Sequence, residues 1–183
     1  MSIRNGLASV NKWETNLGGN EVRISLWVTA LLAIAAIAPA HSEVSYKGPK
    51  PPKPDVVYLM HGDKIVETDQ LEAAQSEDKK KTVYTVTGSS ATARTPLSEP
   101  IFLILPEKIK PEQLSLYPMK IEKGNRVISF HTKPDDDDPR PVPLLFQNRK
   151  DGSVIIEANQ YLENGEYCLS PSGANTVFCF QVY

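Results

Sequence analysis

The chain has 183 residues, a formal net charge of -2 and 23% charged residues, and these values limit what it can be. The length suits one domain with a hydrophobic core of its own and leaves little room for two. The nearly balanced charge lacks the basic field that nucleic-acid binding needs, so we predict no nucleic-acid partner.

An uncharged apolar segment at residues 25–40 (SLWVTALLAIAAIAPA) has the outline of an export signal. The segment is shorter than the ~20 apolar residues that cross a bilayer. Ala38 and Ala40 supply the small side chains that signal peptidase requires at positions -3 and -1. We therefore predict a signal peptide over residues 22–40 that is cleaved before His41, with an uncleaved membrane anchor as the alternative.

Residues 1–21 would make the n-region of this signal unusually long, and they include Glu14 and Glu21. We expect either that translation begins at Val22, whose codon can be the alternative start GUG, or that the n-region is extended. No cysteine closely follows the apolar segment, so the lipid-anchoring signal of bacterial lipoproteins is missing. The product is predicted to be an exported bacterial protein, periplasmic or extracellular, without stable membrane insertion.

A polar, proline-rich stretch at residues 41–55 comes next. Between Ser42 and Asp55 it contains four prolines and three lysines with almost no apolar side chain, a composition typical of an extended, solvated linker. A PxxP ligand for another domain is the alternative interpretation. A single domain is then predicted over residues 56–183.

From Val56 onward, short apolar or alternating runs separated by turn residues predict β-strands. A hairpin is expected to join residues 56–60 to residues 65–67 through Gly62 and Asp63. The continuous apolar run IFLIL at residues 101–105 predicts a central strand that is covered on both faces. Further strands are predicted at residues 82–88, 113–122, 126–132, 142–148 and 153–158, the last two joined by the Asp-Gly turn of RKDG.

Residues 68–81 (TDQLEAAQSEDKKK) are the only stretch with helix-forming composition. Asp69 followed by Glu72 fits a capping box, so a short helix is expected here, with a charged loop as the alternative. Pro118 interrupts the strand at residues 113–122 and indicates an edge position or a bulge. Eight or nine short strands and at most one short helix predict an all-β fold, a small antiparallel β-sandwich or a partly open barrel.

The two cysteines, Cys168 and Cys179, lie in one C-terminal hairpin (GEYCLSPSGANTVFCF). Antiparallel pairing of the two cysteines places aromatic and aliphatic side chains on one face, and a slip of one residue would mix the faces. We therefore predict a structural disulfide, on the more polar face of an edge or surface hairpin. The apolar face consists of Tyr167, Leu169, Phe178 and Phe180.

Other roles for the cysteines have less support. A redox-active pair normally has C-x-x-C spacing at a helix start, which this pair lacks. A zinc site would need two further ligands, and the spacing of His41, His61 and His131 fits no metal-site pattern. Two free thiols are the remaining alternative to the disulfide.

The stretch YLENGEYCL, Tyr161 to Leu169, resembles the leucine, turn-glycine and tyrosine sequence that leads into a late strand of immunoglobulin-like and fibronectin-type sandwiches. The resemblance implies a sandwich of that character and a tyrosine that can form a corner. The match covers nine residues and departs from immunoglobulin domains, where the cysteines lie on different sheets. It implies nothing about function.

No enzyme motif is present: the sequence contains no G-x-S-x-G, no H-E-x-x-H and no glycine-rich phosphate loop. His131 is expected in a strand, on the same face as Val127 and Ser129, as a structural residue. Asp135 to Asp138 form an acidic loop between prolines, for which a solvated loop is favoured over a calcium site because consecutive aspartates point in different directions. We predict no catalytic, cofactor-binding or metal-binding residues.

By elimination, the sequence predicts a non-enzymatic binding or structural accessory module of the cell envelope, with a protein or glycan of the envelope as its partner. A small exported hydrolase with a site assembled in space is the alternative. A deep polar cleft with converging acids or His131 would favour the hydrolase. A third interpretation is that an exposed edge strand accepts a partner strand.

Overall fold

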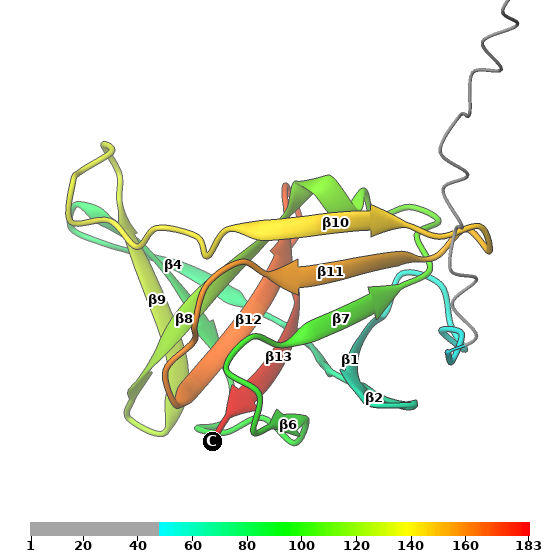
Figure 1. Cartoon of the computed structure of the whole chain (residues 1–183). Helices are drawn as coiled ribbons and strands as arrows, with labels where there is room; N and C mark the ends of the chain where they lie inside the picture. The colour runs from blue at the N-terminus through cyan, green and yellow to red at the C-terminus, as the bar shows by residue number, and fades with distance from the viewer. Residues whose placement is uncertain (1–47) are drawn as a thin grey trace, which may run out of the picture. The chain divides into compact units, whose positions relative to one another are not determined.

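The structure, a computed structural model, describes residues 48–183. The regular elements of this range are β-strands and one 3-10 turn, η1 (Pro111–Gln113). Two sheets pack against each other (Figure 1), which confirms the predicted small β-sandwich and leaves its immunoglobulin-like character a prediction. The predicted signal peptide, with Ala38, Ala40 and His41, lies outside the described residues.

The first sheet has five antiparallel strands in the order β10-β11-β7-β1-β2. The two predicted hairpins, β1–β2 and β10–β11, both form, and they lie at the two edges of this sheet. β7 lies at the centre, and Phe102, Leu103 and Ile104 are fully buried, as predicted for a strand covered on both faces. The strands are β1 (Val57–His61), β2 (Lys64–Glu67), β7 (Ile101–Ile104), β10 (Leu144–Asn148) and β11 (Val154–Ala158).

The second sheet has eight strands, seven of them in the order β3-β13-β12-β8-β9-β5-β4. The eighth strand, β6, pairs in parallel with the end of β13. The strands are β3 (Asp69–Glu72), β4 (Ala74–Asp78), β5 (Lys81–Val86), β6 (Arg94–Thr95), β8 (Leu114–Glu122), β9 (Asn125–His131), β12 (Gly165–Pro171) and β13 (Thr176–Val182).

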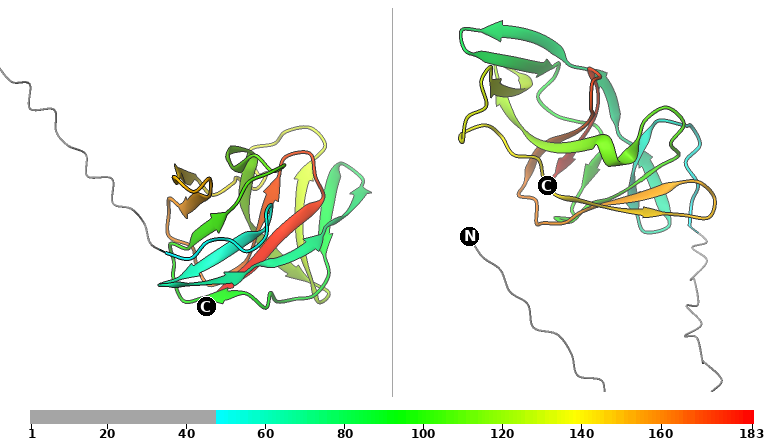
Figure 2. Two further views of the ribbon diagram at one scale, coloured as in Figure 1. Left: turned by 90° about the vertical axis from the view of Figure 1, so that its right-hand side faces the viewer. Right: turned by 90° about the horizontal axis from the view of Figure 1, so that it is seen from above.

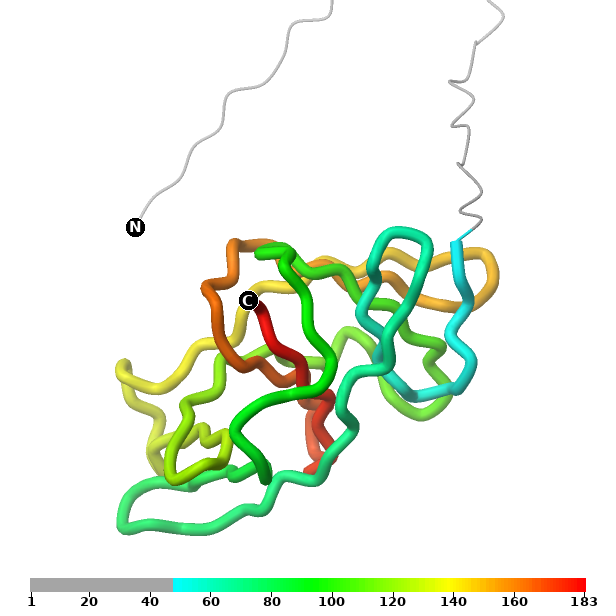
Figure 3. Tube along the Cα trace, turned by 90° about the horizontal axis from the view of Figure 1, so that it is seen from below, coloured from blue at the N-terminus to red at the C-terminus, as the bar shows by residue number. Residues whose placement is uncertain are grey.

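The second sheet closes on itself. Its first and last strands, β3 and β4, are separated in the chain by Ala73 alone, so one continuous segment pairs with β13 and then with β5. β8 also changes partner, from β12 to β9, and Pro118 lies just before this change. The result is a small barrel fused to one face of the sandwich, and the trace in Figure 3 follows its ring of strands. The β4–β5 and β10–β11 hairpins lie far apart in the described domain (Figure 2, right).

The expected helix at residues 68–81 was wrong, because this segment forms β3 and β4. Asp69 does not cap a helix but accepts a hydrogen bond from the Thr92 N–H at 2.7 Å. The inward-facing side chains Leu71 and Ala73 pack in the barrel interior, as a period of two requires. Helix propensity is a weak preference, and pairing to β13 and β5 outweighs it here.

The main core lies between the two sheets. This core and the barrel share three strand segments, namely β12, β13 and the start of β8. One face of these segments packs on the five-stranded sheet, and the other face lines the barrel. Phe102 and Phe180 meet edge to face across this core, with ring centroids 4.9 Å apart. The fully buried side chains around them include Leu59, Ile104, Leu116, Ile156, Leu169 and Phe178.

The C-terminal hairpin has the predicted register, with Cys168 opposite Cys179, and the two cysteines form a disulfide. Its predicted position was wrong. β12 and β13 lie inside the sheet, flanked by β8 and β3, and the two cysteines are 3% and 0% exposed. The more polar face of the hairpin points into the barrel and not into solvent.

Tyr167 makes the corner contact that the resemblance implied. Its Oη donates a hydrogen bond to the carbonyl oxygen of Glu163 at 2.9 Å, while its ring stacks on Phe180 at a centroid distance of 5.7 Å. Leu162, just before the turn, is buried in the main core. The contact fixes how the chain enters β12.

The described part of the proline-rich stretch carries contacts with the domain. Pro51 is buried, and the carbonyl oxygen of Pro49 accepts a hydrogen bond from Arg149. Asp55, at its end, accepts hydrogen bonds from the backbone N–H groups of residues 107–109 at 2.9 to 3.0 Å. Residues 48–55 therefore lie along the five-stranded sheet.

Candidate functional site

The barrel contains a half-open cavity of about 550 Å³ beside the tip of the β12–β13 hairpin. Alternate residues of each strand point inward, so the lining comes from β4, β5, β8, β9, β12 and β13. The volume falls in the range of sites that hold small molecules, about 300 to 1,000 Å³. This cavity is the candidate functional site.

Three aromatic rings on adjacent strands form one wall of the cavity. Phe130 on β9 lies between Tyr84 on β5 and Tyr117 on β8, and all three line the cavity. The ring centroids are 6.1 Å apart for Tyr84 and Phe130 and 5.4 Å apart for Tyr117 and Phe130, both pairs edge to face. All three side chains are only partly buried, so this aromatic wall is available to a ligand.

The cavity becomes more polar from its floor to its mouth. Val86 and Ile128 are buried at the floor beside Cys168 of the disulfide, and Val177 is buried nearer the hairpin tip. The mouth is lined by hydroxyl and amide groups, including those of Ser115, Ser170, Asn175 and Gln75. None of the described residues that line the cavity is an aspartate, glutamate, lysine, arginine or histidine.

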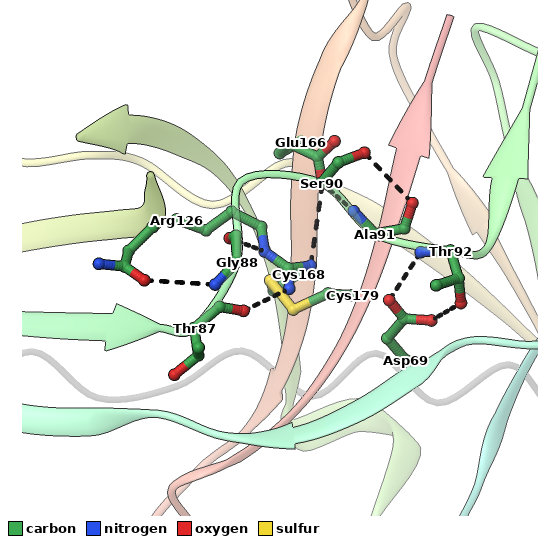
Figure 4. Close-up of polar contacts among 11 residues, drawn as sticks. Asp69, Thr87, Gly88, Ser90, Ala91, Thr92, Arg126, Glu166, Cys168 and Cys179 are labelled. Carbon is green, nitrogen blue, oxygen red and sulfur yellow. Dashed lines mark hydrogen bonds and ion pairs between the residues drawn. A yellow bond between two sulfur atoms is a disulfide. The ribbon is translucent and has the colours of Figure 1, made fainter. Parts of the chain in front are cut away.

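The opposite end of the barrel contains a buried ion pair, between Arg126 and Glu166 (Figure 4). Each lies two residues before a cavity-lining residue of its strand, Ile128 and Cys168, and therefore also points inward. Arg126 is 2% exposed and Glu166 5%. Arg126 Nη1 lies 3.8 Å from Glu166 Oε2, too far for a hydrogen bond.

The ion pair holds the loop of residues 87–93 across this end. Arg126 Nε and Nη2 donate to the carbonyl oxygens of Gly88 and Thr87 at 3.1 and 3.0 Å. Glu166 Oε2 accepts from the Ala91 N–H at 2.9 Å. The loop runs from β5 to β6, which pairs with β13, so it crosses the barrel and closes it.

His131, the histidine considered for a hydrolase, points away from the cavity, since it alternates with Phe130 along β9. Its Nδ1 lies 2.8 Å from Asp138 Oδ1, and its backbone N–H donates to the same oxygen at 2.7 Å. This backbone hydrogen bond is the largest influence that lowers the pKa of Asp138. The pair organises the acidic loop and does not reach the candidate site.

The acidic loop at Asp135 to Asp138 uses its carboxylates on its own backbone. Asp138 Oδ2 accepts from the Asp135 N–H at 3.0 Å, and Asp135 Oδ1 accepts from the Asp137 N–H at 3.1 Å. Within residues 48–183, no group of three or more His, Cys, Asp or Glu side chains is placed to hold a metal ion. The same range contains no helix long and apolar enough to cross a membrane.

Comparison of the chain with protein-family models, with curated proteins and with solved structures finds no match. Inferences about function therefore rest on the site alone.

Proposed function

We propose that this protein is an exported, non-enzymatic binding module of the cell envelope, and that the barrel cavity binds an uncharged amphipathic small molecule. The apolar body of the ligand packs against Tyr84, Tyr117 and Phe130. Its polar, uncharged end lies at the mouth, near Ser115 and Ser170. The observation that carries the proposal is the lining itself, which is aromatic and aliphatic inside, hydroxyl- and amide-bearing at the mouth, and without a charged side chain.

The absence of charge from the lining defines the ligand class. Moving a charged group into an apolar cavity without an opposite charge is costly, so a charged ligand is disfavoured. A hydroxyl or amide at the mouth can exchange hydrogen bonds with Ser115, Ser170 and Asn175. A glycan has less support at this site, because few of its hydroxyl groups would find partners on the aromatic wall.

The disulfide supports the proposed compartment, since such bonds persist outside the reducing cytoplasm. The alternative function, a small hydrolase, has less support. General acid–base catalysis most often uses a histidine or a carboxylate within reach of the bound substrate, and the carboxylates and histidines of the described residues do not line the cavity.

The experiment uses N-phenyl-1-naphthylamine, an uncharged apolar dye whose fluorescence rises in apolar sites. We expect saturable binding to the purified protein and much weaker binding of the anionic dye 8-anilinonaphthalene-1-sulfonate. Ser170→Trp should abolish dye binding, because the indole fills the cavity near its mouth. Ser129→Trp is the matched control, since Ser129 lies on β9 with its side chain outside the barrel.

Circular dichroism and urea unfolding of both variants verify that they are folded. Dye binding that is unaffected by Ser170→Trp would exclude the cavity as the site. Equal affinity for the neutral and the anionic dye would contradict the proposed ligand class.

A further inference from the structure

The five-stranded sheet ends in two edge strands of different character. β2 carries Lys64 and Glu67, and Glu67 pairs with Lys53 at 2.9 Å. Charged side chains on an edge strand discourage pairing with another chain. β10, with the sequence LLFQN, carries no charge at all.

The uncharged edge also exposes apolar side chains on both of its faces. Leu145 is 51% exposed and Phe146 is 36% exposed, and successive residues of a strand point to opposite faces. An edge strand that is uncharged and apolar on both faces is a template for pairing with another strand.

The hydrogen-bond phase of β10 determines which backbone groups are free. Arg149 N–H donates to the Ser153 oxygen and Asn159 N–H donates to the Pro143 oxygen, both at 2.9 Å. Hydrogen-bonded pairs recur at every second residue of an antiparallel ladder. The odd-numbered residues from 143 to 149 therefore bond to β11.

The even-numbered residues Leu144, Phe146 and Asn148 consequently direct their N–H and C=O groups out of the sheet. A partner strand must match this phase. When two copies of β10 pair in antiparallel fashion about Phe146, each residue with outward-directed N–H and C=O groups lies opposite another such residue. The backbone donors and acceptors of the two strands therefore match.

We propose that β10 pairs with β10 of a second copy of this chain, about a two-fold axis at Phe146. Phe146 then lies opposite Phe146 of the second copy, and Leu144 lies opposite Asn148. This register forms about six backbone hydrogen bonds, two for each outward-directed pair. The two five-stranded sheets become one continuous sheet across the dimer.

A second copy suits this edge because the pairing is self-complementary. No charge is placed opposite another charge, and the two Phe146 rings become cross-strand neighbours, a favourable pairing. On the other face Leu145 lies opposite Gln147.

A two-fold pairing of one patch with itself is the commonest route to a closed dimer. A five-residue edge is small beside standard interfaces of about 1,200 to 2,000 Å², so the dimer dissociates on dilution.

The first experiment tests the register by cysteine crosslinking of the full chain. In the proposed dimer, Phe146→Cys places two cysteines opposite each other at a Cα separation of about 5.5 Å, which suits a disulfide. Gln147→Cys is the matched control, because Gln147 lies opposite Leu145 and not opposite itself. Mild oxidation should crosslink the first variant to a dimer and leave the second largely monomeric.

The second experiment measures self-association by sedimentation over a concentration series. The unmodified protein should form dimers that dissociate on dilution, and Phe146→Glu should abolish them by placing two carboxylates together on the axis. Val66→Glu adds the same charge to the other edge strand, where Val66 is 38% exposed, and should leave dimers unchanged.

A protein that is monomeric at every concentration would overturn the proposal, and so would equal crosslinking of the two cysteine variants or equal loss of dimers in the two glutamate variants. The dye-binding site in the barrel does not enter these measurements, so the two proposals can fail separately.

Discussion

Arg126 and Glu166 face each other inside the barrel, 3.8 Å apart and almost fully buried, and together they bond three backbone groups of the loop that closes one end. Neither Arg126 Nη1 nor Glu166 Oε1 has a hydrogen-bond partner of its own in residues 48–183. Each charge therefore depends on the other for compensation, and the loop depends on both.

Glu166→Gln should strongly destabilise the protein, because it leaves the Arg126 charge buried without an opposite charge. Breaking such a pair typically costs about 3–5 kcal/mol. The free energy of unfolding in urea measures the loss. Lys53→Met, which breaks the exposed pair with Glu67, is the control and should change stability little.

The double variant Arg126→Met/Glu166→Leu separates the pair from the loop contacts. The single variants Arg126→Met and Glu166→Leu each leave one buried charge unpaired. If the unpaired charge is the main cost, the double variant loses less free energy of unfolding than the two single variants lose in sum. Strict additivity would show that the two side chains act on the loop independently.

The disulfide between Cys168 and Cys179 should be unreactive in the folded protein. Thiol reagents should label no cysteine in the native, unreduced protein, since both residues are paired. Replacement of both by alanine should lower the free energy of unfolding by at most about 3 kcal/mol on the chain-entropy account.

Replacement of both cysteines by serine should cost more than replacement by alanine. Both sulfurs lie among apolar neighbours in the barrel, and a hydroxyl there that finds no hydrogen-bond partner carries a desolvation penalty. Equal stability of the two double variants would contradict the buried position of the hairpin.

Tyr167→Phe should lower stability by about 1 kcal/mol, the typical net value of one hydrogen bond, because it removes the bond to Glu163 and keeps the ring. Tyr161→Phe is the matched control, because Tyr161 is 76% exposed. Urea unfolding of the two variants compares them directly. If both variants have the same free energy of unfolding as the unmodified protein, the corner contact has no net effect on stability.

The sequence predicted those parts of the fold that rest on local patterns. The register of the C-terminal hairpin follows from the alternation of Tyr167, Leu169, Phe178 and Phe180 against polar residues, and it is confirmed. The β1–β2 and β10–β11 hairpins form around the two turns predicted from Gly62 and Asp63 and from the Asp-Gly of RKDG. Turn chemistry and a period of two are properties of a few consecutive residues, so they can be predicted from sequence.

The strand count allows a partly open barrel, but the closure of the barrel is not predictable from the same patterns. Its closing segment, β3 and β4, is rich in glutamate, alanine and glutamine, a composition that predicts a short helix or a charged loop, so no strand is predicted there to complete the ring. The pattern predicts a surface position for the polar face of the Cys168 hairpin, because polarity alone cannot distinguish a barrel interior from a surface. Arg126 and Glu166 lie on strands that are distant in sequence, and charged side chains in strands are usually exposed.

Asp55→Asn should destabilise the protein near neutral pH and make less difference in acid. Burial alone would raise the pKa of this carboxyl, but the backbone N–H groups of Ile109, Glu107 and Lys108 hold it below its ordinary value of 3.8. A lowered folded-state pKa contributes stability above the unfolded-state pKa, and this contribution is lost as the pH falls through the folded-state value. Asparagine tolerates the φ angle of 56° at this position, so backbone strain should not obscure the effect. Urea unfolding should therefore show a constant difference between the two proteins from about pH 7 to 5 that shrinks below about pH 4; a difference independent of pH would show that the charge of Asp55 has no part in it.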